Sequence, residues 1–77
     1  MTIEVFAVLK DYFDKEFKFE GSAKNIAELK QQLAFKNPEA INVLNLCRFA
    51  VRDEFVDSNF SINSNDTISI IPPSSGG

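Results

Sequence analysis

The order in which the apolar pattern changes period constrains the fold of this 77-residue chain most strongly. Two early segments, 2–9 and 16–20, are rich in β-branched and aromatic residues, and the second alternates strictly between charged and apolar residues. Side chains alternate between the two faces of a strand, so these segments predict a buried strand and a half-buried strand with Phe17 and Phe19 inward. The short connection over 9–15 predicts an opening β-hairpin.

A helical pattern follows the second strand. Asn25 and Glu28 form a capping-box sequence, in which each side chain can bind a free backbone N–H at the helix start. Apolar residues then recur at helical spacing until Asn37 and Pro38 end the run. The sequence predicts a main helix starting at Asn25 and a second short helical turn from Pro38 through Leu44.

Strand patterns return over 49–52, 54–56 and 67–71, with Asp53 as a turn and 58–66 as a polar loop. A hairpin, then a helix, then further strands predicts an α+β domain. We expect a mixed sheet with one main helix packed on one face, which is the β-grasp or ubiquitin-like fold.

Size and composition exclude several classes of protein. The length allows one domain, and 44% apolar residues suffice for a core that needs no disulfide or structural metal ion. Cys47 has no partner for an internal disulfide and no leader precedes Ile3, so we expect a cytoplasmic protein. The longest apolar stretch, 5–9, is too short for a membrane span. A net charge of −3 with scattered basic residues argues against nucleic acid.

The chain lacks the side chains of a self-contained active site. Without histidine, neither a Ser-His-Asp nor a Cys-His arrangement can form. One cysteine and no histidine leave no ordinary zinc ligand set. The oxygen-rich segment 57–66 has Ile62 where a calcium loop requires glycine, so we expect no metal site. Cys47 is expected to be a buried, inert thiol.

The last six residues carry the functional signal. Pro72 and Pro73 each lack a backbone N–H donor, so strand pairing should stop at Ile71. We therefore expect a folded domain over 1–71 and a flexible, extended tail over 72–77 that reaches into partner proteins.

The end of the tail predicts a chemistry that needs no catalytic side chain. Ser74, Ser75, Gly76 and Gly77 complete the sequence, and the glycines fit a channel too narrow for any other residue. Adenylation of the Gly77 carboxylate by an ATP-using partner would give a mixed anhydride, and sulfide transfer would give a thiocarboxylate. The competing interpretation of 74–77 is a frayed end or a linker remnant.

Several segments together resemble the small subunit of molybdopterin synthase, nearly end to end. The resemblance is carried by 6–11, the helix over 25–33, 50–56, 65–68 and the closing Pro-Pro-Ser-Ser-Gly-Gly. It implies a β-grasp fold with no bound cofactor. It also implies three partners: an E1-like adenylyltransferase that uses ATP to activate Gly77, a sulfur donor enzyme, and the large synthase subunit. In the family, two large and two small subunits form a heterotetramer. Within it, sulfur passes from the small subunit to cyclic pyranopterin monophosphate and forms molybdopterin.

Strand parity predicts a partner-binding surface. Ile71 and Phe6 share faces with polar neighbours, and with Phe55 they could form an exposed apolar patch. Lys10 is assigned to the same surface. The competing interpretation is that these phenylalanines belong to the core, where phenylalanine of a small sheet is commonly found. At this surface the chain departs from the family, because family members often have arginine at the position of Lys10 and an aromatic residue at the position of Ile71. A third departure is Arg52, where the family often has asparagine.

Two other functions remain open from the sequence. The first is a thiocarboxylate carrier for thiamine synthesis or tRNA thiolation, which the Pro72-Pro73 pair disfavours. The second is a ubiquitin-like binding module whose tail is chemically idle.

Overall fold

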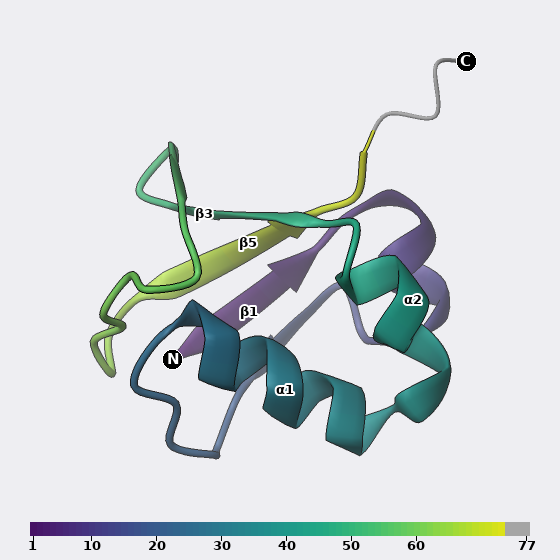
Figure 1. Ribbon diagram of the computed structural model, residues 1–77, viewed down its shortest axis with the longest axis horizontal. Coiled ribbons are helices and arrows are strands. Elements are labelled where there is room, and N and C mark those ends of the chain that lie inside the picture. The colour runs from purple at the N-terminus through teal and green to yellow at the C-terminus, as the bar shows by residue number, and fades with distance from the viewer. Residues whose placement is uncertain (74–77) are drawn as a thin grey trace.

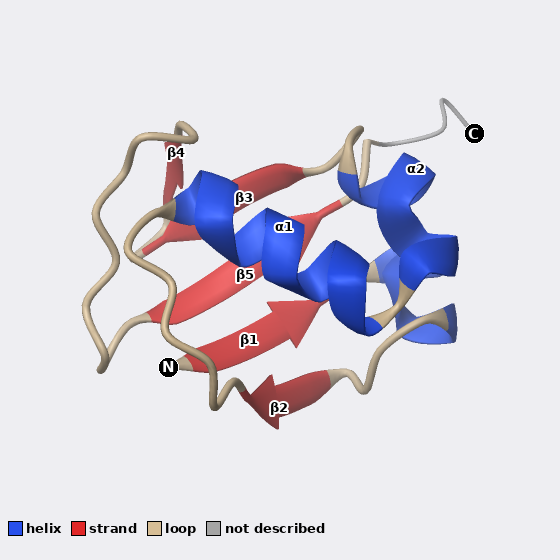
Figure 2. Cartoon of the chain, turned by 60° about the horizontal axis from the view of Figure 1, so that its bottom comes forward, coloured by secondary structure: helices blue, strands red, loops and turns tan. Residues whose placement is uncertain are grey.

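The computed structural model describes residues 1–73, which form a five-stranded sheet covered on one face by helices (Figures 1 and 2). The sheet order is β2-β1-β5-β3-β4; β1 and β5 are parallel, and the other neighbours are antiparallel. The elements are β1 (Thr2–Val5), the 3₁₀ helix η1 (Ala7–Asp11), β2 (Glu16–Lys18), α1 (Ile26–Lys36), the 3₁₀ helix η2 (Pro38–Ala40), α2 (Ile41–Leu44), β3 (Arg48–Val51), β4 (Glu54–Val56) and β5 (Thr67–Ile71). The expected mixed sheet with one main helix is confirmed.

Helix α1 starts at the predicted cap. Asn25 Oδ1 accepts a hydrogen bond of 2.9 Å from the backbone N–H of Glu28. The return bond is displaced by one residue, because Glu28 Oε1 accepts from the N–H of Lys24 at 3.1 Å rather than from that of Asn25. The second helical segment is also confirmed as η2 and α2, with Asn37 capping the N–H of Glu39.

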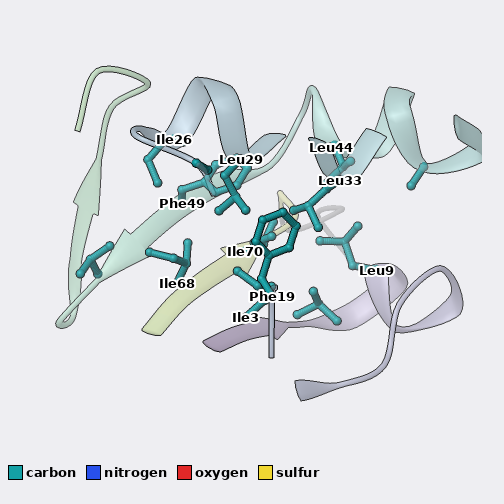
Figure 3. Packing of buried hydrophobic residues seen from close by; sticks show 14 residues of the cluster. Ile3, Leu9, Phe19, Ile26, Leu29, Leu33, Leu44, Phe49, Ile68 and Ile70 are labelled. Atoms are coloured by element: carbon teal, nitrogen blue, oxygen red, sulfur yellow. The ribbon is translucent and has the colours of Figure 1, made fainter. Parts of the chain in front are cut away.

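The core lies between α1 and the sheet (Figure 3). Leu29 and Leu33 of α1 are fully buried, as are Ile3 of β1 and Ile68 and Ile70 of β5 on the two central strands. Each such aliphatic side chain contributes about 1.5–3 kcal/mol through removal from water. The core therefore fixes which face of the sheet is covered and which is left open.

The first strand is shorter than predicted, since β1 ends at Val5 and not at Leu9. Ala7 has a positive φ of 54°, which turns the chain into η1, and the N–H of Leu9 bonds to the carbonyl of Phe6 at 3.1 Å. Leu9 is fully buried although Val8 is exposed. Periodicity does not separate a continuous apolar run of this kind from a strand followed by a helical turn. The strands β1 and β2 do pair, but η1 replaces the expected short hairpin turn.

Strand β2 ends two residues earlier than predicted and β3 is shifted by one residue, whereas β4 and β5 have the predicted bounds. Strand β2 stops at Lys18, yet the N–H of Phe19 still bonds to the carbonyl of Met1 at 2.9 Å. Phe19 is buried and Phe17 is half-buried, so both point inward as expected.

A tight turn joins β3 to β4 at the predicted place. Arg52 and Asp53 both have positive φ, 51° and 66°, and Val51 pairs with Glu54 across the turn. This is the left-handed geometry of a type I′ hairpin, which asparagine and glycine adopt most readily.

Candidate partner-binding site

The site is built around the point where β5 ends. Ile71 makes the last pair of the sheet, opposite Arg48 of β3, and Pro72 and Pro73 follow it. Pairing therefore stops where the diproline predicted. The assigned tail residues Ser74, Ser75, Gly76 and Gly77 lie outside the described residues, and their roles stay predictions.

Phe6 lies next to this point on the open face of the sheet. Val5 is buried and pairs in parallel with Ile70, so the next residue along each strand is Phe6 and Ile71. Phe6 is extended, with φ −128° and ψ 158°, and alternation directs its side chain away from the core. Its side chain is exposed, as the sequence predicted.

Phe55 reaches the same face from β4. It is 53% exposed and lies opposite Ala50. The Arg48 guanidinium carbon lies 3.7 Å from the centroid of the Phe55 ring, a cation–π contact. Because β3 runs between β5 and β4, Arg48 stands between Ile71 and Phe55. We call Phe6, Ile71, Arg48 and Phe55 the open-face patch.

The sequence interpretation missed Arg48. Its face is readable only from the pairing of β3 with both neighbours, which sets it opposite Ile71 and diagonal to Phe55. The local sequence shows only that Arg48 precedes the buried Phe49, so that alternation along β3 directs the Arg48 side chain to the opposite face.

Lys10 comes four residues after Phe6, on the 3₁₀ helix that follows β1. It is exposed on η1 and lines a cleft together with Phe13, Phe17 and Lys36 on the β2 side of the molecule. Its assignment to the partner-binding surface stays a prediction. The open-face patch thus consists of three predicted apolar residues and one unpredicted cation.

Cys47 is half-buried rather than fully buried, and its thiol is not activated. Burial raises the pKa of the Cys47 thiol above its ordinary value of 9.0, and the nearby Lys30 ammonium only partly opposes this. The Sγ atom lies 3.1 Å from the carbonyl oxygen of Val43, to which it donates. A raised pKa leaves less thiolate at neutral pH, which is consistent with the predicted inert thiol.

Two absences hold for the part of the chain that the structure describes. Within residues 1–73, no three His, Cys, Asp or Glu side chains are grouped so that they could hold a metal ion. None of the helices in this range combines the length and apolar character needed to cross a bilayer.

A five-stranded mixed sheet, a helix across one face and an open face ending in an apolar patch beside a diproline define a ubiquitin-like β-grasp protein. The chain belongs to the ThiS family, whose model matches residues 3–77. No curated protein sequence matches it.

Two solved structures cover almost the whole chain. One belongs to a protein–protein complex of subunits 1 and 2 of molybdopterin-converting factor from Helicobacter pylori 26695, with a TM-score of 0.71 and 25% identity over 99% of this chain and 96% of that chain. The other is SAMP1 from Haloferax volcanii, with a TM-score of 0.79 and 15% identity over 99% and 97% of the two chains, which shows the fold alone. The β-grasp fold and the membership of a ubiquitin-like sulfur-carrier family are confirmed.

Proposed function

We propose that this chain is the sulfur-carrying small subunit of molybdopterin synthase. The observation that carries the proposal is the end-to-end similarity to a chain from the complex of the two molybdopterin-converting factor subunits. The family match extends through residue 77 and so includes the Gly-Gly sequence.

The proposed chemistry uses the backbone carboxylate of Gly77. An E1-like adenylyltransferase joins this carboxylate to the AMP part of ATP and releases pyrophosphate. A sulfur donor enzyme then supplies a sulfide equivalent, which attacks the acyl carbon and expels AMP, leaving a thiocarboxylate. The thiocarboxylate gives its sulfur to cyclic pyranopterin monophosphate in the large subunit. In this scheme the folded body contributes binding rather than catalysis, which fits the raised pKa of Cys47.

The open-face patch is the proposed contact with the large subunit. Phe6 and Phe55 are 43% and 53% exposed, and Ile71 lies between their strands in the sheet order. Apolar side chains gathered at one end of a sheet face are typical of a protein–protein interface. This patch adjoins Pro72, so a partner bound there holds the start of the tail.

The central experiment combines the purified protein with the E1-like enzyme, ATP and the sulfur donor, followed by intact-mass measurement. We expect replacement of one oxygen by sulfur, located to Gly77 by fragmentation, and no change when ATP is omitted. If no oxygen is exchanged for sulfur although the enzymes are active, the carrier function is refuted. The remaining alternative is then a ubiquitin-like binding module whose tail takes no part in chemistry.

Binding to the large synthase subunit separates molybdopterin synthesis from the alternative pathways. A carrier for thiamine synthesis or tRNA thiolation would also form a thiocarboxylate, but it would not bind this subunit. The family match and the fold shared with SAMP1 do not distinguish molybdopterin synthesis from these two alternatives, so this binding measurement decides between them. A cytoplasmic location stays a prediction.

A further inference from the structure

Arg48 is the one charged member of the open-face patch. Its partner in the sheet is Ile71, and its guanidinium stacks on Phe55 at 3.7 Å. A protein that covers both Ile71 and Phe55 must therefore also cover Arg48, because β3 lies between the strands that carry them.

The guanidinium has no acidic partner of its own. Within residues 1–73, the ion pair that the structure contains joins Arg52 to Asp66, and Arg48 takes no part in it. Asp57, the residue that follows β4, uses its Oδ1 to accept from the N–H of Asn59 at 2.9 Å. Stacking on a ring occupies the face of a guanidinium and leaves its N–H groups free to donate.

The surroundings of Arg48 add positive charge. A cleft of about 540 Å³ lies between α1 and the β3–β4 edge; its lining includes Arg48, Phe55 and Asp57 from the strand side and Lys30 from α1. Two cations against one anion favour a negatively charged occupant.

Covering Arg48 with an apolar surface alone is unfavourable. A charge that loses water without gaining a partner costs several times what a surface ion pair contributes, whereas a guanidinium paired with a carboxylate makes strong, short hydrogen bonds. An interface through Ile71 and Phe55 is therefore stable only when the partner supplies an acceptor for Arg48.

From this, and resting on the function proposed above, we propose that the large subunit places an aspartate or glutamate against Arg48, and that this ion pair determines which partner the open-face patch accepts. Arg48 is a specificity-determining residue of the docking surface. The stack on Phe55 holds its guanidinium in place before the partner arrives, which reduces the side-chain entropy lost on binding.

The test is calorimetric titration of the full-length protein into the large subunit at low and high ionic strength. The variants are Arg48→Gln, Arg48→Glu and Arg48→Lys, with Lys24→Gln as a charge-matched control on the exposed loop before α1. We expect Arg48→Gln to bind about 10- to 100-fold more weakly, as for loss of a charge-assisted hydrogen bond. Arg48→Glu should bind more weakly still, Arg48→Lys should lie between wild type and Arg48→Gln, and Lys24→Gln should match wild type.

Salt and thermal unfolding complete the test. The difference between wild type and Arg48→Gln should shrink as salt is raised, because screening weakens the ion pair. Unfolding midpoints close to wild type would show that the variants are folded. The proposed carboxylate partner of Arg48 would be overturned if the wild type binds and Arg48→Gln binds with the same affinity. It would also be overturned if Arg48→Gln and Arg48→Glu bind with equal affinities. Failure of the wild type itself to bind the large subunit would overturn the proposed function, and the inference with it.

Discussion

Asp66, whose side chain is only 6% exposed, binds the exposed Arg52 with an Oδ1–Nη1 distance of 2.9 Å. Its second oxygen accepts from the backbone N–H of Asn63 at 2.9 Å. One carboxylate thus joins the β3–β4 turn to the loop that precedes β5.

Removing the two partners should have unequal effects. Asp66→Ala leaves the Asn63 N–H without its acceptor and should lower the free energy of unfolding by about 1–3 kcal/mol. Arg52→Gln removes only the exposed half of the ion pair and should cost less than about 1 kcal/mol. Urea unfolding of both variants measures the difference, and equal losses would contradict this assignment of the stabilising contact.

The β3–β4 turn should be improved by glycine. Asp53 has a φ of 66°, a region that glycine enters without strain, so Asp53→Gly should raise the free energy of unfolding by up to about 1 kcal/mol. Glu54→Gly, one residue later in the strand, is the matched control and should be destabilising. The same sign for both variants would show that turn strain does not limit stability.

Cys47 should react slowly with alkylating agents. Because burial raises its pKa above 9.0, the native thiol stays protonated at pH values where the unfolded chain has begun to ionise. Its contribution to stability is therefore complete below about pH 9 and is lost as pH rises through the folded pKa. Iodoacetamide rates with and without denaturant measure this, and equal rates would contradict it. Cys47→Ala should leave sulfur transfer unchanged.

The open-face patch should lose binding through a single polar substitution. Phe55→Ser removes both the apolar contact and the ring beneath Arg48, and we expect at least about 10-fold weaker binding to the large subunit. Phe35→Ser is a matched control, since Phe35 is 89% exposed on α1 and belongs to the helical layer. Similar losses in both variants would move the interface away from the patch.

The Gly-Gly sequence should tolerate no side chain in the working complex. Gly76→Val should abolish synthase activity, because a β-branched side chain does not fit a channel shaped for glycine, while the unfolding midpoint should stay near that of wild type. Ser75→Ala is the control and should remain active. Normal turnover by Gly76→Val would contradict the channel.

Local sequence signals predicted the features that depend on a few neighbouring residues. The Asn25 cap starts α1 one residue later, and the Arg52-Asp53 turn lies where Asp53 indicated. The diproline ends pairing at Ile71. Each of these follows from backbone donors, φ preferences or side-chain caps within one turn of chain, so no distant partner is needed to decide it.

Features that depend on distant partners were decided only by the tertiary structure. The apolar run 2–9 divides at Phe6 because β5 pairs with β1 only as far as Val5, and Leu9 reaches the core from η1 instead. Arg48 joins Phe55 and Ile71 because β3 pairs with β4 on one side and with β5 on the other. The sequence alone determined the elements and the end of the last strand, since those are local. The composition and charge of the open-face patch came from strand register, which only contacts between segments far apart in the chain can set.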